Sequence, residues 1–222
     1  MSENQPSQES LPPEQEISRL KEENRVLLEA NAKLTQELEQ AKEEAGTDYL
    51  TKLPNRKTLL YNLQIELEKV NRGGRLAVAM LDLDKFKQIN DRFGHDRGDE
   101  VLVEFSNKIQ DQLRGTDIFG RFGGEEFLLL LPLQDSTSPE DVDNILKRYR
   151  LSIRSINTSG ESNNEDSLTI SGGCVIIEKN NNLSTKEVLK TVDENLYQSK
   201  NSGRNRITLT HTSPSNTGTP KS

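Results

Sequence analysis

Residues 120–130 combine a flexible turn with two acid groups, and they read Gly-Arg-Phe-Gly-Gly-Glu-Glu-Phe-Leu-Leu-Leu. The glycines at positions 123 and 124 allow a tight turn and leave room for a bulky ligand beside the backbone. The carboxylates Glu125 and Glu126 follow directly, before an apolar run that is typical of a buried strand. This arrangement suits metal-dependent chemistry on a phosphate. A hairpin with two solvated glutamates is the alternative, because Gly-Gly turns are common.

A second pair of acid groups follows the apolar run Leu-Ala-Val-Ala-Met-Leu at residues 76–81, which is typical of a strand covered on both faces. The pair is Asp82 and Asp84, and a sheet usually opens onto its ligand at the end of such a strand. Mg²⁺ takes oxygen ligands, usually one or two carboxylates together with substrate phosphates and waters. We expect Asp82 and Glu125 to supply those carboxylates. We expect Asp84 to cap a helix that starts at Lys85 instead.

Composition limits the classes of protein to which the chain can belong. It has 222 residues, a formal net charge of −7 and 31% hydrophobic residues, which allows one domain together with non-globular segments. The acidic balance argues against a general nucleic-acid binder. No signal peptide or membrane-spanning run is seen, so a cytoplasmic protein without a membrane partner is expected. The single cysteine, Cys174, lies in an apolar run and is expected to be buried in the core.

The first 46 residues divide into two segments of different character. Residues 1–13 are polar and contain three prolines, so they are expected to be disordered. Residues 14–46 are rich in Glu, Lys, Gln, Leu and Ala and carry apolar residues on a heptad repeat. The apolar heptad residues are Ile17, Leu20, Leu27, Leu34, Leu38 and Ala41. This seam favours a coiled coil.

Polar residues of the same heptads favour a parallel homodimer. With Ile17 at an a position, Asn24 and Asn31 are also at a, and a buried Asn there costs stability but favours a parallel, in-register pair. Two charged g-to-e pairs can bridge the helices, Glu16 with Lys21 and Glu37 with Lys42. The alternative is a single solvated helix, which leaves the leucine seam exposed.

Residues 47–210 carry alternating helix and strand signals. The expected helices lie at about 55–70, 85–92, 97–113, 139–153 and 184–200, with helix starts at Asn55, Ser138 and Ser184. The expected strands lie at about 76–82, in a hairpin over 118–132, at 168–178 with an interruption at Gly172 and Gly173, and at 206–210. Hairpin and crossover connections together predict one α/β domain with a mixed sheet. Residues 211–222 are expected to form a disordered tail.

Five ordered motifs give residues 48–209 a family resemblance. They are Asp-Tyr-Leu-Thr-Lys-Leu-Pro-Asn-Arg at 48–56, Asp-Leu-Asp-Lys-Phe-Lys-Gln-Ile-Asn-Asp at 82–91, Gly-His-Asp-Arg-Gly-Asp at 94–99, Gly-Gly-Glu-Glu-Phe at 123–127, and Leu-Tyr-Gln-Ser-Lys at 196–200 with Gly-Arg-Asn at 203–205. In this order they resemble the GGDEF domain of diguanylate cyclases. The resemblance implies a palm-like mixed sheet surrounded by helices, similar to nucleotidyl cyclases, over residues 47–210. The dimeric coiled-coil helix of residues 14–46 would precede it.

The resemblance also implies an activity and its cofactors. Two molecules of GTP would condense to cyclic di-GMP plus two pyrophosphates at the interface of two such domains, so the partners are GTP and a second copy of the chain, with no nucleic acid. Asp82, the Leu83 carbonyl and Glu125 would hold Mg²⁺ or Mn²⁺, two ions per active site. Glu125 or Glu126 would take the proton of the attacking 3′-hydroxyl, and the sequence leaves that choice open.

Two further residues would read the base. Asn90 and Asp99 match the guanine-binding positions of the family, and a carboxylate can accept hydrogen bonds from the guanine N1–H and amino group. Adenine lacks this pair of donors. The alternative for Asp99 is structural, because it can be the N3 residue of a helix capped by Asp96.

The phosphates would lie between a small turn and several cations. Gly123 and Gly124 would let the α- and β-phosphates approach the backbone. Lys200 and Arg204 match the residues that reach the β- and γ-phosphates, with help from Lys87. Cations are also favoured at a helix end without any ligand, which is the alternative interpretation.

Residues 114–117 read Arg-Gly-Thr-Asp just upstream of the turn. By position they match the Arg-x-x-Asp inhibitory site of the family, where the product cyclic di-GMP binds as an allosteric inhibitor. The planar fork of Arg114 suits pairing with a guanine edge or a phosphate, with Asp117 beside it. The alternative is an ordinary surface ion pair between Arg114 and Asp117, which contributes little stability.

Overall fold

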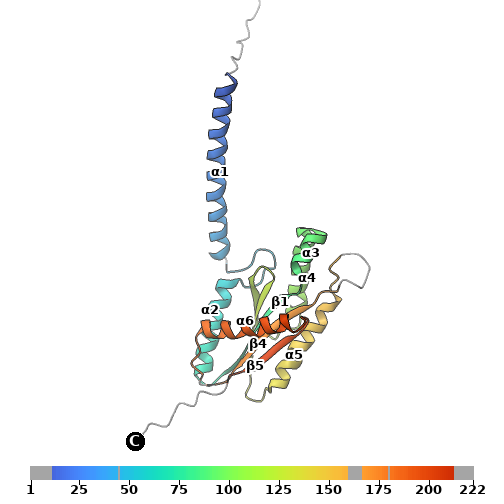
Figure 1. Cartoon of the computed structure of the whole chain (residues 1–222). Coiled ribbons are helices and arrows are strands. Elements are labelled where there is room, and N and C mark those ends of the chain that lie inside the picture. Colours follow the sequence, from blue (N-terminus) through green and yellow to red (C-terminus); the bar gives the residue numbers. More distant parts are fainter. Residues whose placement is uncertain (1–11, 45, 160–166, 180, 213–222) are drawn as a thin grey trace, which may run out of the picture. The chain divides into compact units, whose positions relative to one another are not determined.

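The computed structural model describes residues 12–44, 46–159, 167–179 and 181–212 (Figure 1). The chain forms two compact units, one that ends at Ala45 and one that starts at Gly46. The segments predicted to be disordered, 1–13 and 211–222, lie largely outside the described residues. Among the described residues, no helix has the length and apolarity needed to cross a bilayer.

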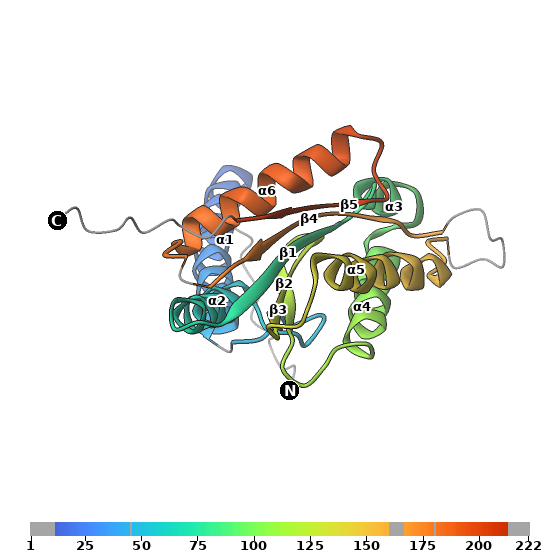
Figure 2. The same ribbon diagram turned by 90° about the horizontal axis from the view of Figure 1, so that it is seen from below.

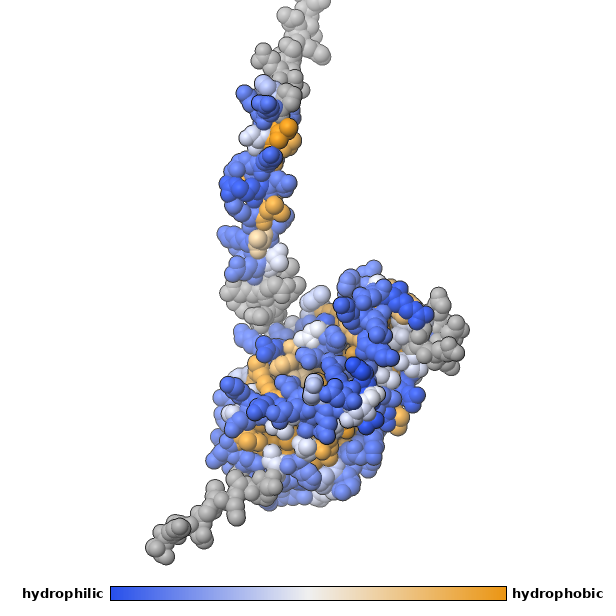
Figure 3. Space-filling view, viewed as in Figure 1, coloured by the Kyte–Doolittle hydropathy of each residue, from blue (hydrophilic) through white to orange (hydrophobic). Residues whose placement is uncertain are grey.

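Helix α1, Pro13–Glu44, forms the first unit and confirms the helix expected from the heptad repeat. Its seam is exposed in the single chain, since Leu27 and Leu34 are 56% and 61% accessible. Figure 3 shows apolar patches on this otherwise hydrophilic helix. The side chains of three predicted heptad residues lie outside the described part, namely Leu38, Ala41 and Lys42. The pairing of two such helices stays a prediction.

The second unit contains a five-stranded sheet in the order β2-β3-β1-β4-β5. The strands are β1 (Arg75–Leu83), β2 (Ile118–Gly123), β3 (Glu126–Leu133), β4 (Ile170–Ile177) and β5 (Ile207–His211). β1 is central and pairs antiparallel with both β3 and β4, whereas β4 and β5 are parallel. The mixed sheet confirms the predicted fold class.

Helices cover both faces of this sheet (Figure 2). The helices are α2 (Arg56–Asn71), α3 (Phe86–Phe93), α4 (His95–Gln110), α5 (Pro139–Ser152) and α6 (Thr185–Asn201), with a 3₁₀ turn at Ile153–Ser155. α2 and α6 pack on one core, and α4 and α5 pack on the other. Alternate β1 side chains enter these cores: Val78 and Met80 enter the first, and Ala79 and Leu81 enter the second. Both faces of β1 are therefore buried, which explains its continuous apolar run.

The predicted helix starts at Asn55, Ser138 and Ser184 are confirmed, and each side chain accepts a hydrogen bond from a backbone N–H in the first turn. The predicted cap at Asp84 is wrong. The N-cap of α3 is Lys85, whose φ of 60° is left-handed, and it makes no side-chain cap bond. The Asp84 carboxylate instead accepts hydrogen bonds from Thr169, Ser171 and Asn205.

The prediction that Asp96 caps the next helix is also wrong. The N-cap of α4 is Gly94, at a φ of 87°, and α4 begins at His95, two residues earlier than expected. A glycine is favoured at such a positive φ, so the backbone itself fixes the helix start. Asp96 lies in the first turn, and Asp99 is therefore beyond the N3 position.

The predicted interruption of β4 at its two glycines is wrong as well. β4 is continuous, and Gly172 and Gly173 pair with β1 on one side and β5 on the other. Gly173 makes room for α6, because a Cβ there would lie 2.0 Å from the Val192 carbonyl oxygen of that helix. A Cβ on Gly172 would instead meet the side chains of Leu81 and Ile207 at 2.9 and 3.0 Å. Ser199 of α6 donates a hydrogen bond to the Gly172 carbonyl at 2.7 Å.

Candidate active site

The hairpin between β2 and β3 brings its acid groups beside the end of β1. Asp82 is the cross-strand partner of Glu126, and the Leu83 N–H donates to the Glu125 carbonyl at 3.3 Å. A bulge between Arg121 and Gly123 precedes the turn. The carboxylates predicted from two separate motifs therefore lie next to one another.

The turn itself leaves open space next to its backbone. Gly124 has a φ of 45°, in the left-handed region that favours glycine. A Cβ added at Gly123 or Gly124 would meet no atom within 4 Å among the described residues. A ligand phosphate can therefore approach this backbone without meeting a side chain.

The carboxylates at this place are crowded and partly removed from water. Asp82 is buried, and Lys200 from the last turn of α6 donates to its Oδ2 atom at 2.7 Å. Burial raises the pKa of Asp82 above its usual range, against the attraction of Lys200 and Arg204. Burial and the charge of Asp82 likewise raise the pKa values of Glu125 and Glu126. A cation would relieve this repulsion.

The donor set suits a hard divalent cation. No cluster of three or more His, Cys, Asp or Glu side chains that could hold a metal ion occurs in the described part of the chain. Mg²⁺ does not require one, because it is usually held by one or two carboxylates and completed by substrate phosphates and waters. Asp82 and Glu125 fit that pattern. The backbone carbonyl of Leu83, the residue after Asp82, is the third predicted ligand. Asp84 does not fit the pattern, because hydroxyl and N–H donors occupy both of its oxygens.

The two residues predicted to read the base, Asn90 and Asp99, lie in neighbouring helices, on α3 and α4 respectively. The Oδ1 atom of Asn90 is buried and has no hydrogen-bond partner among the described residues. A buried amide oxygen without a donor is costly, so a water or a ligand donor is the expected partner. Gly98 makes room for it, since a Cβ there would lie 1.8 Å from that oxygen. Nearby, Leu50, Asp99 and Val103 line an open groove.

Two predicted phosphate-binding cations are exposed, and a third has a partner already. Lys87 lies exposed on α3, and Arg204 lies exposed in the loop after α6. The Arg204 side chain makes no ion pair with any described residue. Lys200 is paired with Asp82, so in this structure it neutralises a carboxylate at the predicted metal site.

The Arg114–Asp117 segment is a turn rather than a side-chain ion pair. The Asp117 carboxylate accepts from the Arg114 backbone N–H at 2.9 Å, and the Asp117 N–H donates to the Arg114 carbonyl at 3.0 Å. Arg114 and Arg148 of α5 both line a pocket at the surface. Sequence reasoning missed Arg148. The available signal was its position next to Tyr149, a buried residue in the apolar stripe of α5.

Sequence reasoning also missed the ion pair of Arg121 and Asp48, which contacts the backbone of the Gly-Gly turn. Arg121 donates through Nε to the Gly124 carbonyl at 2.9 Å and through a terminal nitrogen to Asp48 at 3.2 Å. Asp48 also accepts from the backbone and hydroxyl of Thr51. The available signal was that Arg121 is the single charged residue of β2.

Comparison with known sequences links this geometry to one family. The family model described as "Diguanylate cyclase, GGDEF domain" matches residues 45–206. Diguanylate cyclase DgcP of Pseudomonas aeruginosa is 40% identical over 173 residues, which are 77% of this chain and 25% of that protein. Diguanylate cyclase DosC of Escherichia coli K12 is 34% identical over 77% of this chain and 36% of that protein. The chain thus spans only a quarter to about a third of these curated relatives.

A solved structure resembles both units in their order along the chain. It is the coiled coil and GGDEF domain of DgcB from Caulobacter crescentus in complex with c-di-GMP. The TM-score is 0.67 with 30% sequence identity, and the match covers 86% of this chain and 99% of that one.

Proposed function

Because the chain belongs to the GGDEF-domain diguanylate cyclase family, we propose that it condenses two molecules of GTP into cyclic di-GMP and two pyrophosphates. The observation that carries the proposal is the placement of Asp82 against Glu125 and Glu126, beside a turn with open space over its glycines. Acid groups and a bare backbone are what phosphoryl transfer needs, because it depends on positioning and charge neutralisation.

In each half of the reaction a 3′-hydroxyl oxygen attacks an α-phosphorus, and the bond from that phosphorus to pyrophosphate breaks. Asp82, the Leu83 carbonyl and Glu125 would hold Mg²⁺ or Mn²⁺. Two such ions per site, when bound, neutralise phosphate charge and make the 3′-hydroxyl more acidic. Glu125 or Glu126 receives the hydroxyl proton as a general base.

The remaining residues position the nucleotide. Asn90 and Asp99 read guanine, and the unpaired Asn90 oxygen supports this role because it can accept from the base. Gly123 and Gly124 admit the phosphates to the backbone. The cations Lys87, Lys200 and Arg204 bind the phosphates. Lys200 is held by Asp82 in this structure, and it could exchange that carboxylate for a phosphate if a bound cation neutralised Asp82.

Condensation requires two such sites, so the active form is a homodimer. The exposed leucine seam of α1 supports a parallel coiled coil between two copies. Pairing there raises the effective concentration of one catalytic unit at the other. The solved DgcB structure, whose chain also comprises a coiled coil and a GGDEF domain, is consistent with this arrangement.

Product would bind at the turn of Arg114 and Asp117 and inhibit. Arg148 adds a second guanidinium to the same pocket, which supports binding of a guanine edge or a phosphate. The Asp117 carboxylate accepts from the Arg114 backbone N–H and not from its guanidinium, which leaves that guanidinium able to bind the product.

The test is incubation of the purified protein with GTP and Mg²⁺, followed by mass-spectrometric detection of cyclic di-GMP. The wild-type protein should form it, ATP should give no cyclic dinucleotide, and Glu125→Gln should lower the rate at least 100-fold, since one of two metal-binding carboxylates is lost. A wild-type protein that binds GTP as a dimer yet forms no product would instead be a nucleotide-binding module.

A further inference from the structure

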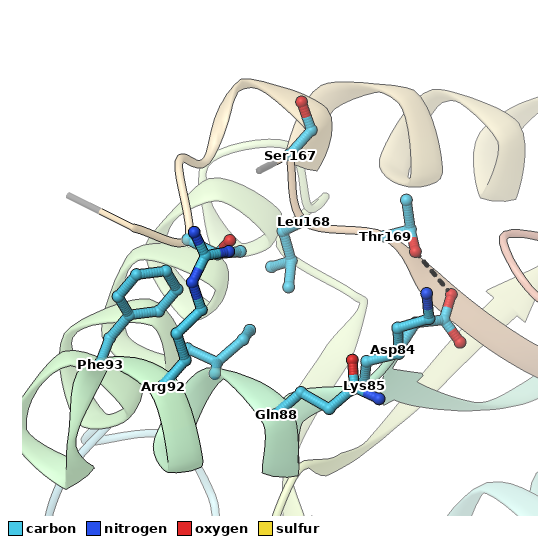
Figure 4. A pocket seen from close by; sticks show the side chains of 10 residues that line it. Asp84, Lys85, Gln88, Arg92, Phe93, Ser167, Leu168 and Thr169 are labelled. Carbon is cyan, nitrogen blue, oxygen red and sulfur yellow. Dashed lines mark hydrogen bonds between the residues drawn. The ribbon is translucent and has the colours of Figure 1, made fainter. Parts of the chain in front are cut away.

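Both oxygens of the Asp84 carboxylate accept hydrogen bonds from the fold, although Asp84 lies two residues from Asp82 of the proposed metal site. Its Oδ1 accepts from the Ser171 hydroxyl at 2.7 Å, and its Oδ2 accepts from the Thr169 hydroxyl at 2.8 Å and from the Asn205 backbone N–H at 3.0 Å. Figure 4 shows Asp84 facing Thr169 at the wall of a pocket of about 340 Å³ between α3 and the start of β4. The side chain is buried. Asp84 therefore joins the segment that leads into β4 to the loop after α6, and three donors already occupy its two oxygens.

The loop after α6 is strained. Gly203, Arg204 and Asn205 have φ values of 104°, 61° and 48°, so three successive residues are left-handed. The two that are not glycine each cost roughly 1 kcal/mol or more in this region. Such a backbone persists only where surrounding contacts over-determine it.

Asn205 supplies those contacts from both sides. Asp84 accepts its N–H, while Arg150 of α5 donates to its side-chain oxygen at 2.9 Å and to its carbonyl at 3.3 Å. The preceding residue, Arg204, has an exposed side chain that makes no ion pair with any described residue. The Arg204 backbone is also held directly, because its N–H donates to the Ser199 carbonyl at 3.1 Å and its carbonyl accepts from Arg206 at 3.3 Å. The bonds to Asn205 fix the residue that follows and so complete the set of contacts that sets the direction of Arg204.

We propose that Asp84 is a positioning residue, which acts through the Asn205 N–H to aim Arg204 at the β- and γ-phosphates of the nucleotide. This inference rests on the proposed function, which assigns those phosphates to Arg204. The strain of the loop means that, without Asp84, Arg204 has a choice of directions and an ordering cost on binding.

The test measures equilibrium affinity for α,β-methylene-GTP with Mg²⁺, because this analogue keeps all three phosphates and does not react. Asp84→Ala should weaken binding roughly tenfold, the size of one charge-assisted hydrogen bond. Asp84→Asn should restore most of the affinity, because its amide oxygen still accepts from Asn205. Arg150→Ala should weaken binding in the same direction, and it provides a variant outside the metal site if Asp84→Ala does not fold.

Two controls separate positioning from general damage. In the Arg204→Ala background, Asp84→Ala should cause less than a twofold further loss, since the residue through which it acts is gone. Asp84→Ala alone should leave the affinity for GMP unchanged, because GMP lacks the β- and γ-phosphates. The proposal is overturned if the two losses multiply, if GMP binding falls equally, or if Asp84→Asn is as weak as Asp84→Ala. A wild-type protein that fails to bind the analogue removes the proposed function, and this inference with it.

Discussion

At the scale of residues, the site is a group of acids held together before any ligand arrives. Asp82 reaches Glu125 and Glu126 through strand pairing, and burial together with mutual repulsion raises the pKa values of the two glutamates. Lys200 supplies one compensating charge at 2.7 Å from Asp82. The free protein thus carries an electrostatic cost that bound cations would remove.

This cost predicts a pH dependence of stability. The folded pKa values of Glu125 and Glu126 lie above the unfolded ones, so the folded state holds more protons between the two. Stability therefore falls as pH rises from the ordinary glutamate pKa, about 4.3, through the raised values. Glu125→Gln should raise the melting temperature at pH 7 in EDTA by a few degrees and flatten this fall. The exposed Glu68→Gln is the control, and an equal gain there would contradict the explanation.

Gly98 offers a test of base recognition. A Cβ at this position would lie 1.8 Å from Oδ1 of Asn90 and 3.2 Å from the Phe86 ring, so the Asn90 side chain has to move away from its present place. Gly98→Ala should leave stability unchanged or raise it, because alanine favours a helix interior by about 1 kcal/mol over glycine. The KM for GTP should rise roughly tenfold, the value of one lost hydrogen bond to the base. An unchanged KM for GTP would contradict the role of Asn90 in guanine binding.

At the scale of elements, the position of α6 decides where Lys200 lies. The helix packs against the glycine pair of β4, and Ser199 and Asn195 donate hydrogen bonds to the Gly172 and Cys174 carbonyls. Lys200 follows Ser199 directly, so a displaced helix would displace the cation from Asp82.

Gly173→Ala is the matching substitution. Its Cβ would lie 2.0 Å from the Val192 carbonyl oxygen and 2.3 Å from the Leu196 nitrogen, both of which are backbone atoms that cannot turn aside. We expect a loss of roughly 1–3 kcal/mol in unfolding free energy, as for other overpacked sites. Denaturant unfolding measures it. Gly115→Ala, where a Cβ meets nothing within 4 Å, should change stability little, and a neutral Gly173→Ala would contradict this packing.

The elements also show how far sequence reasoning reaches. The central strand, the hairpin and the caps at Asn55, Ser138 and Ser184 follow from local patterns, and the structure confirms them. Asp84 and Gly173 were misread because their partners lie far away in the chain, at residues 169, 171 and 205 for the first and in α6 for the second. Local signals such as an Asp before a helix cannot reveal that the backbone bends at Lys85.

At the scale of the whole molecule, the proposed reaction joins two copies of the chain. The leucine seam of α1 is exposed in one chain, and the sequence carries one copy of the Gly-Gly-Glu-Glu-Phe motif. Arg114 and Arg148 line a surface pocket where the product cyclic di-GMP would bind and inhibit. Dimerisation would bring the two GTP-binding domains together, and bound product would keep them from reacting.

Replacing Leu27 and Leu34 together with Gln should weaken the dimer and make specific activity depend on protein concentration. Sedimentation and initial rates over a 100-fold dilution measure both effects. Val26→Gln is the control, because this exposed apolar residue lies at a heptad c position outside the seam. Constant specific activity of the double variant at high dilution would refute dimerisation through α1.

The proposed condensation is tested by counting the products formed from GTP and Mg²⁺ in a sample whose dimeric state has been confirmed. The wild-type protein should release two pyrophosphates for each cyclic di-GMP formed, and EDTA or Glu125→Gln should abolish both. Release of pyrophosphate without cyclic di-GMP, or full activity in Glu125→Gln, would contradict the assignment of the Asp82–Glu125 site to this condensation.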